Sequence, residues 1–458
     1  MYKRIMVVVA LSWIGCDGRD AKQPAAAAPA ATVATTAAHA NPRARAEHGR
    51  KLFVAWCSGC HGERGLGDGP AAAVLIPKPR NFVRDKFKIR STPSASPPTR
   101  QDLLATVERG LPGTAMPSFK FLPEEERGLI VDHVRSLAGL DTQPEPTPIV
   151  LSKEPGSSAE SIARGKLLYV KFGCVQCHGA EGRGDGPASN TLKNDLGEPI
   201  PARDYSKGLY LGGDSPEAVH MRFRTGLDGT GMPSFGDSLQ MGDGWDLTYF
   251  VLSLRKPKPP LPSDLVARGQ QVVEDKQCFA CHVINGKGGD VGPSLDVASQ
   301  KLRWDWLRTF LEDPLKPGKI YPYMPYRMPP LGLTAPEIDG VVALLAKNAH
   351  RAVSETSPPT PTFDPKKVAD GQLLYFLKCT ECHNLGKVIP NPVAKQVGPD
   401  LINVTRRIEL KWIPTWVNNP KSVYPNARMV DTNLTPSQIE AVTAFVWKTS
   451  ADAQTIGK

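Results

Sequence analysis

Cys57-Ser-Gly-Cys60-His61 follows the pattern Cys-x-x-Cys-His, which occurs four times in this chain of 458 residues. The other copies are Cys174-Val-Gln-Cys177-His178, Cys278-Phe-Ala-Cys281-His282 and Cys379-Thr-Glu-Cys382-His383. Together the copies contain eight of the nine cysteines. Successive copies are about a hundred residues apart, so each has one small domain to itself. Chain length alone, at roughly 150 residues per domain, suggests about three domains, but the repeat predicts four.

Each copy of the pentapeptide lies between two stretches with apolar residues at helical spacing. The opening stretches begin at Gly49, Gly165, Gly269 and Gly371, and the closing stretches cover residues 129–134, 247–251, 338–342 and 439–445. Because glycine has no side chain to hold two helices apart, we expect the two helices of each domain to cross closely. The pattern predicts four all-α domains, here called domains 1 to 4, at residues 47–140, 158–256, 263–351 and 364–450, joined by the Pro-rich linkers 141–157, 255–263 and 354–363.

Cys-x-x-Cys-His is the attachment signature of c-type haem. Two thiols three positions apart reach the two vinyl groups on one edge of the porphyrin and form thioether bonds, and the histidine then lies under the iron. We therefore expect four covalently bound haems, attached through Cys57 and Cys60, Cys174 and Cys177, Cys278 and Cys281, and Cys379 and Cys382, with His61, His178, His282 and His383 as iron ligands. A zinc site would need two cysteine pairs within one small domain, and thioredoxin-like chemistry would not explain the four histidines.

A second ligand is needed on the far side of each iron. Outside the pentapeptides only five histidines remain, too few and badly placed for four bis-histidine haems. Methionine fits better, although methionine also fills gaps in protein cores. Met116 and Met232 stand in matching Gly-Thr-x-Met-Pro-Ser-Phe segments, 55 (116−61) and 54 (232−178) residues after their haem histidines. Met328 and Met429, each preceded by Arg, take this role in domains 3 and 4, with Met324 as a rival to Met328.

Two further features recur beside the pentapeptides. A Gly-Pro step follows each haem histidine, at residues 69–70, 186–187, 292–293 and 398–399. We expect a backbone carbonyl there to accept the imidazole Nδ1–H and to fix the orientation of the ligand; the alternative is a loop turn that merely recurs. Two aromatic pairs at i, i+4 spacing, Trp306 with Phe310 and Trp412 with Trp416, are expected to cover a haem edge or to pack in the core.

Residues 1–16 have the form of an export signal, with a charged start, a short apolar run and a small residue before the cut. The apolar run is shorter than the ~20 residues that cross a bilayer as a helix, so we expect no spanning helix in the mature protein. Cys16 follows a segment that resembles the lipobox of bacterial lipoproteins, and we expect it to be lipidated; the alternative is that Cys16 is removed with the signal. Residues 17–46, rich in Ala and Pro, are expected to form a flexible tether.

The composition is that of a folded protein, with 40% hydrophobic and 22% charged residues, so wholesale disorder is excluded. The net charge of +10 suggests nucleic acid or an acidic partner. Each haem would bring about two negatively charged propionates, which reduces the weight of that charge. Because the chain carries an export signal, we expect no nucleic acid partner.

Taken together, residues from about 47 to 450 resemble the class I cytochrome c family in four consecutive copies. Domains 1 and 2 resemble each other most, since they share Gly-Asp-Gly-Pro (67–70 and 184–187) and the Met-Pro-Ser-Phe segment, and domains 3 and 4 form a second pair. The resemblance implies an opening helix, a Gly-Pro loop, a distal methionine and a closing helix in each copy. Iron with both His and Met ligands has no open position for a substrate.

The expected function is that of a tetrahaem electron carrier on the periplasmic side of a bacterial membrane, anchored by lipid at Cys16. It would transfer single electrons from a quinol- or substrate-oxidising enzyme to a terminal oxidase or reductase, because His/Met ligation raises the potential of haem iron. The alternatives are a haem-bearing subunit of a larger membrane respiratory complex and a multihaem peroxidase or reductase with one open iron.

Overall fold

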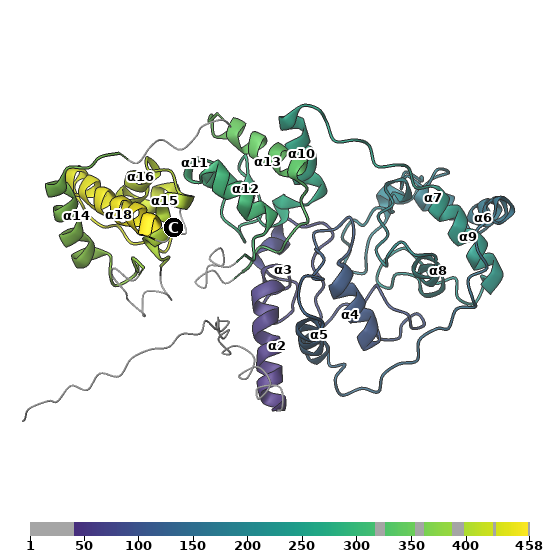
Figure 1. The fold of residues 1–458 in the computed structure, drawn as a ribbon. Helices are drawn as coiled ribbons and strands as arrows, with labels where there is room; N and C mark the ends of the chain where they lie inside the picture. The colour runs from purple at the N-terminus through teal and green to yellow at the C-terminus, as the bar shows by residue number, and fades with distance from the viewer. Residues whose placement is uncertain (1–40, 317–325, 353–360, 387–397, 425–426, 457–458) are drawn as a thin grey trace, which may run out of the picture. The chain divides into compact units, whose positions relative to one another are not determined.

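The fold is built almost entirely from helices (Figure 1). The computed structural model describes residues 41–316, 326–352, 361–386, 398–424 and 427–456. All four pentapeptides lie within one compact unit of the chain, Ala46–Lys458. The prediction of an all-α fold is confirmed. The strands of the described residues form one short hairpin in domain 3, where β1 (Val283–Ile284) pairs antiparallel with β2 (Lys287–Gly288) directly after the third pentapeptide.

The elements of the first two domains follow the same order. Domain 1 contains α2 (Pro42–Trp56), α3 (Ser58–His61), the 3-10 helix η1 (Pro70–Ala73), α4 (Arg100–Arg109) and α5 (Glu124–Leu137). Domain 2 contains α6 (Ala159–Lys171), α7 (Val175–His178), the 3-10 helices η2 (Ser189–Thr191) and η3 (Tyr205–Lys207), α8 (Pro216–Thr225) and α9 (Met241–Ser253). Side-chain caps begin several of these helices; the Thr99 hydroxyl, for example, accepts the backbone N–H of Asp102 at the start of α4.

The other two domains repeat the plan with shorter connections. Domain 3 contains α10 (Leu265–Asp275), the 3-10 helix η4 (Cys278–Ala280), α11 (Leu295–Lys301), α12 (Trp304–Glu312) and α13 (Ala335–Asn348). Domain 4 contains α14 (Pro365–Lys378), the 3-10 helix η6 (Leu401–Asn403), α15 (Val404–Arg407), α16 (Trp412–Asn418), α17 (Pro420–Val423) and α18 (Pro436–Ile456).

The opening and closing helices cross at the recurring glycine, as predicted. A Cβ atom at Gly165, Gly269 or Gly371 would overlap a backbone carbonyl of the closing helix, that of Asp246, Gly340 or Ala441 respectively. In domain 1 a Cβ atom at Gly49 would likewise overlap the backbone carbonyl of Leu129 in the closing helix. The residue four positions after each glycine, one turn along the helix, is fully buried in the domain core: Phe53, Tyr169, Val273 and Tyr375.

The amino-terminal predictions lie largely outside the described residues. This holds for the export signal of residues 1–16, for Cys16 and for most of the tether of residues 17–46, although α2 begins within that tether, at Pro42. Within the described ranges, no helix has both the length and the apolar composition needed to span a membrane.

His220 is an unusual core residue of domain 2. It is 0% exposed on α8, and its ring makes an edge contact with Trp245 of α9, with 4.4 Å between ring centroids. Neither ring nitrogen has a hydrogen-bond partner among the described residues. Burial lowers the pKa of His220 from about 6.5 to about 4, because the charged form would lose its hydration. His220 is therefore a neutral core residue at physiological pH.

We predict that His220 makes the stability of domain 2 depend on pH. Between about pH 6.5 and pH 4 the unfolded chain binds more protons than the folded one, so stability falls as the pH falls through this window, by on the order of 3 kcal/mol in total. Denaturant unfolding measures the free energy of unfolding at pH 7 and at pH 4.5. The difference between these two values should be smaller for His220→Leu than for the parent. His48→Gln, at a partly exposed position of α2, is the control. An unchanged difference in His220→Leu contradicts the prediction.

Candidate haem-binding sites

Each pentapeptide forms one helical turn directly after the opening helix. In all four copies the histidine N–H donates to the carbonyl of the first cysteine, at 2.9 Å for His61, His178 and His383 and at 3.0 Å for His282. A turn of this kind places residues three and four apart on the same face, so both thiols and the imidazole of one copy lie together. Tyr169 and Tyr375 tie the turn to the opening helix, since their hydroxyls donate to the carbonyls of Gly179 and His383.

The eight motif cysteines are free of disulfide bonds. Burial raises the pKa of Cys57 and Cys60 to about 12 and that of Cys174, Cys278 and Cys379 to about 11. These apolar surroundings suit a neutral thioether better than the thiolates that bind zinc. Within the described ranges, no cluster of three or more His, Cys, Asp or Glu side chains is arranged to hold a metal ion.

The four haem histidines are each oriented by a backbone carbonyl. In each case the imidazole Nδ1 donates to a backbone carbonyl oxygen. The pairs are His61 with Arg80 (2.9 Å), His178 with Arg203 (3.1 Å), His282 with Pro293 (2.7 Å) and His383 with Pro399 (2.9 Å). This bond fixes the tautomer and leaves Nε2 for iron. Burial lowers the pKa of all four imidazoles, which favours the neutral, iron-binding form.

The prediction that the Gly-Pro step supplies this carbonyl is right in domains 3 and 4 and wrong in domains 1 and 2. In those two domains a longer loop supplies the carbonyl. A backbone hydrogen bond holds each loop in place: the Phe82 N–H donates to the Gly65 carbonyl at 2.7 Å, and the Tyr205 N–H donates to the Gly182 carbonyl at 2.6 Å. The first Gly-Pro step instead packs on its own pentapeptide, with the Gly69 N–H bonded to the Cys60 carbonyl. The shared Arg-Asn-Phe and Arg-Asp-Tyr steps at 80–82 and 203–205 are the sequence signal of this loop.

An aromatic ring follows the carbonyl in domains 1 and 2 and stacks on the histidine. Phe82 lies 4.6 Å from the ring of His61, and Tyr205 lies 4.4 Å from that of His178, between centroids. The Tyr205 hydroxyl donates to Nε2 of His178 at 3.0 Å. Haem iron would bind this nitrogen, so Tyr205 must give up the bond when haem is attached.

Met116 and Met232 lie at the ends of two loops with the same internal bonds. In each loop the N–H of a leucine, Leu111 or Leu227, donates to the methionine carbonyl, and a threonine hydroxyl accepts the methionine N–H. Met328 and Cys278 both pack against the domain 3 core, and Met429 and Cys379 both pack against the domain 4 core. The rival Met324 lies outside the described residues. Each predicted methionine is therefore brought to the pocket or core of its own pentapeptide.

The aromatic pairs of domains 3 and 4 lie in the same cores. Trp306 and Phe310 stack with 5.0 Å between centroids, and Trp306 packs in the cluster that contains Met328. Trp412 is buried and Trp416 is partly buried in the cluster that contains Met429. Their positions fit both the expected contact with a haem edge and ordinary core packing.

Sites 1 and 2, formed by the predicted ligands of domains 1 and 2, open into one cavity of about 1040 Å³. Cys57, Cys60, His61 and Met116 line it together with Cys174, Cys177, His178 and Met232. Apolar and aromatic side chains make up most of the remaining lining, as a porphyrin ring requires. The residues present thus fit two haem groups in a shared chamber.

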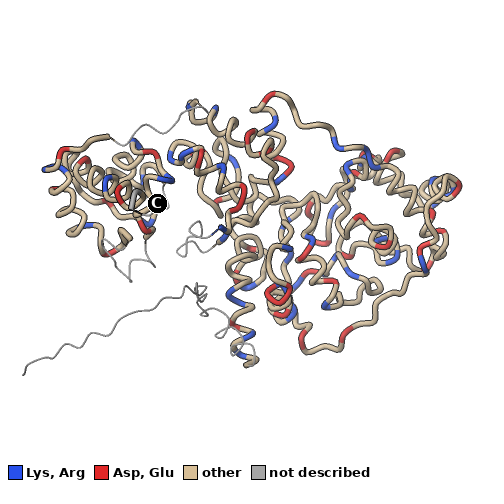
Figure 2. Tube along the Cα trace, viewed as in Figure 1, with Lys and Arg blue, Asp and Glu red and all other residues tan. Residues whose placement is uncertain are grey.

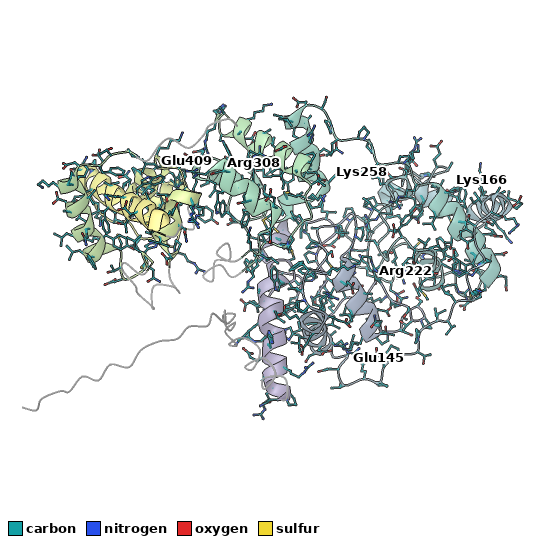
Figure 3. The ribbon with its side chains drawn as sticks, in the orientation of Figure 1. Glu145, Lys166, Arg222, Lys258, Arg308 and Glu409 are labelled. Atoms are coloured by element: carbon teal, nitrogen blue, oxygen red, sulfur yellow. The ribbon has the colours of Figure 1, made fainter. Side chains whose placement is uncertain are left out.

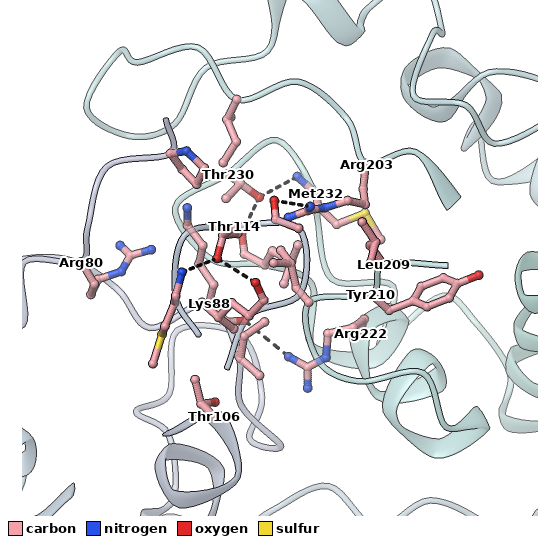
Figure 4. Close-up of a pocket in the computed structure, with 18 of the residues that line it drawn as sticks. Arg80, Lys88, Thr106, Thr114, Arg203, Leu209, Tyr210, Arg222, Thr230 and Met232 are labelled. Atoms are coloured by element: carbon pink, nitrogen blue, oxygen red, sulfur yellow. Dashed lines mark hydrogen bonds between the residues drawn. The ribbon is translucent and has the colours of Figure 1, made fainter. Parts of the chain in front are cut away.

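Basic side chains also line this cavity, among them Arg80, Lys88, Arg203 and Arg222 (Figure 4). Burial lowers the pKa of Lys88 to about 8 and that of Arg222 to about 10. The Nε atom of Arg222 is buried without a hydrogen-bond partner in the described structure. Haem propionates are the negative groups that these cations would pair with. The sequence reasoning did not place these residues at a cavity, although Arg80 and Arg203 begin the matching steps at 80–82 and 203–205.

A family model for cytochrome c matches residues 46–138, 162–255, 266–349 and 368–450, well over half of the chain. The chain therefore belongs to the cytochrome c family. It is a multihaem c-type cytochrome, a haem protein of electron transport.

Among solved structures, the chain is similar to a chain of the reducing HAO-like protein complex of Kuenenia stuttgartiensis. The two sequences are 38% identical over 46% of this chain and 96% of that chain, with a TM-score of 0.45. No curated protein matches the chain.

We predict that each methionine can be assigned to its iron separately. Met116→Ala in the haem-loaded protein should remove about a quarter of the Met–iron charge-transfer absorbance and lower the potential of one haem, because sulfur ligation raises it. Spectroscopic redox titration measures both. Met241→Ala, at the start of α9 and outside every predicted site, is the matched control. Full absorbance in Met116→Ala would exclude Met116 as a ligand.

Proposed function

We propose that the protein is a tetrahaem electron carrier that exchanges single electrons with redox proteins outside the cytoplasmic membrane. The observation that carries this proposal is the fourfold combination of two thiols, a carbonyl-oriented histidine and a methionine in the same pocket or core. Haem c bound at such a site supplies one-electron redox chemistry. The cysteines would hold the ring, the oriented histidine would bind the iron, and the methionine would be its second protein ligand, which would leave no position for a substrate.

The proposed partners are a quinol- or substrate-oxidising enzyme as donor and a terminal oxidase or reductase as acceptor. Basic and acidic residues are interspersed along all four domains (Figure 2), so charge alone does not specify the partner. Electrostatic complementarity with a partner sets the rate of encounter more than the final affinity. The membrane anchor proposed at Cys16 would hold the carrier near such enzymes.

A redox titration with a haem count tests the carrier function. We expect four haems per chain, all low-spin and reversibly reduced by one electron each, and no turnover of hydrogen peroxide. A five-coordinate, high-spin haem together with peroxide turnover would instead establish the peroxidase alternative. Stoichiometric membrane subunits in the purified material would establish the complex subunit.

The lipid anchor has its own test. Cys16→Ala should move the haem-loaded protein from the membrane fraction to the soluble periplasmic fraction, because the attached acyl chains provide the membrane affinity. Metabolic labelling with a radioactive fatty acid should mark the parent and not the variant. A parent protein that is soluble and unlabelled would show that Cys16 is removed with the signal.

A further inference from the structure

We propose that electrons pass through the four sites in the order 2–1–3–4, which differs from their order along the chain, and that sites 2 and 4 are the ends where redox partners bind. This inference rests on the proposed carrier function. Electron tunnelling falls steeply with distance, so the route follows the contacts between sites. In each step one iron is oxidised from ferrous to ferric, the next is reduced from ferric to ferrous, and no bond is formed or broken.

The contact between sites 2 and 1 joins their ligand loops. Arg203, whose carbonyl orients His178 of site 2, donates from its guanidinium to the Gly113 carbonyl at 3.1 Å, three residues before Met116 of site 1. The fully buried Arg90 of domain 1 pairs with Asp228 of domain 2 at 2.8 Å. Residues of both domains line the shared cavity (Figure 4), so haems bound at sites 1 and 2 would lie next to each other.

The contact between sites 1 and 3 joins their pentapeptides. Cys60 and Cys281, one thiol from each motif, pack in a single buried cluster with Ala71 and Ala280. A Cβ atom at Gly59, inside the first motif, would lie 3.0 Å from Val291 Cγ1 of domain 3. The haem edges bonded to Cys60 and Cys281 would therefore face each other.

The Met328 loop strengthens this contact. The N–H of Arg327, the residue before Met328, donates to the Ala55 carbonyl of α2 at 3.1 Å. The guanidinium of Arg327 also lies over the ring of Trp56, 5.5 Å from its centroid. The distal loop of site 3 is thus bonded to the helix end that carries site 1.

The contact between sites 3 and 4 again joins ligand loops. The hydroxyl of Tyr424, five residues before Met429, donates to the Asp290 carboxylate at 2.7 Å, and Asp290 stands three residues before Pro293, whose carbonyl orients His282. A bridge between Leu302 and Ile408 adds backbone pairing between domains 3 and 4.

The nearly buried ion pair of Arg351 with Glu409 closes this interface at 2.6 Å (Figure 3 labels Glu409). Its low exposure, 5% for Arg351 and 14% for Glu409, distinguishes it from an ordinary surface pair. These bonds attach domain 4 to domain 3. In the proposed order of sites, domain 4 is therefore one end and domain 2 is the other.

The two end domains also differ from the inner two on the outer face of the opening helix. Leu167 and Val170 of α6 are 72% and 59% exposed, and the corresponding face of α14 bears the exposed Leu373, Phe376 and Leu377. At the position of Leu167 and Leu373 the inner domains have Lys51 and Gln271 instead.

Exposed lysines flank both apolar faces: Lys166, which Figure 3 labels, and Lys171 in domain 2, and Lys378 in domain 4. Each face lies on the helix that leads into a pentapeptide. An apolar centre with a basic rim fits a redox protein whose contact surface is apolar with an acidic rim.

Flash kinetics on the full-length, haem-loaded protein test the order. A ruthenium photosensitiser on Val170→Cys injects one electron beside site 2, with a sacrificial reductant present. Met429→Ala opens site 4 to carbon monoxide, so arrival of the electron there gives a distinct absorbance change. Met116→His lowers the potential at site 1 and should slow arrival by at least about tenfold. Met241→His is the control.

The outcomes separate the two proposals. If arrival at site 4 is equally fast with Met116→His, site 1 is not on the route and the order is wrong. If no electron reaches site 4 even without Met116→His, the carrier function itself fails. If Met116→His does not retain four haems, Gly59→Leu serves instead, because it pushes the motifs of sites 1 and 3 apart without changing an iron ligand.

A cross-link tests the contact of sites 1 and 3 without electron transfer. A Cβ atom at Gly59 would lie 3.0 Å from Val291 Cγ1, and its three nearest atoms all belong to side chains, so Gly59→Cys with Val291→Cys should form a disulfide between domains 1 and 3, detected by mass spectrometry of a digest. Val83→Cys with Val291→Cys, which uses an exposed valine of domain 1, should remain unlinked. Absence of the first cross-link in the folded, haem-loaded protein overturns the proposed contact.

The end faces are tested with reduced flavodoxin, an acidic one-electron donor, as the probe. Leu167→Asp with Leu373→Asp should slow reduction of the protein several-fold, because the apolar centres are lost and two negative charges oppose the acidic donor. Lys51→Gln with Gln271→Asp makes the same total charge change at the equivalent inner positions and should leave the rate near that of the parent. Equal slowing by both pairs of substitutions would show that only the net charge matters. That result would contradict the proposal that redox partners bind at the two end faces.

Discussion

The crossing of two helices at a glycine is the constraint on which each haem site depends. The glycine brings the backbone of the opening helix against the closing helix, as at Gly371 against the Ala441 carbonyl. The opening helix then ends at a fixed place, and the pentapeptide turn begins there. A larger residue would have to displace a whole helix, because the opposing atoms are backbone and cannot change rotamer. The imidazole can meet its orienting carbonyl only once this geometry is set.

The sequence predicted those features of each domain that depend on residues close together in the chain. The fourfold pentapeptide, the helical periodicity around it and the recurring glycine predicted four helical units, and each predicted methionine that the structure describes lies in the pocket or core of its own pentapeptide. The Gly-Pro step predicted the orienting carbonyl in domains 3 and 4, at Pro293 and Pro399, where the loop is short. In domains 1 and 2 a longer loop competes for the same position, and only the matching steps at 80–82 and 203–205 indicated it.

Contacts between domains had no such signal, because they depend on residues far apart in sequence and of no distinctive spacing. Arg203 begins a recognisable step, but nothing in the sequence indicates that its carbonyl orients His178 of site 2 while its guanidinium bonds to the loop of site 1. Asp290 and Tyr424 are 134 residues apart and meet through one hydrogen bond. The proposed contact of domain 1 with both domain 2 and domain 3 rests on such distant residues, and no sequence pattern indicated it.

The partly buried cations between domains 1 and 2 link haem binding to the packing of the two domains. Lys88 and Arg222 are largely shielded from water, and desolvation of a positive group is unfavourable unless a negative group compensates for it. Asp102 acts on Arg222, and Asp85 and Glu198 act on Lys88, but burial still lowers the pKa of both cations. Propionates entering the shared cavity would supply the missing charge, so haem attachment in either domain would stabilise the interface as well as its own site. Assembly of the two domains and loading of their haems are then one coupled process.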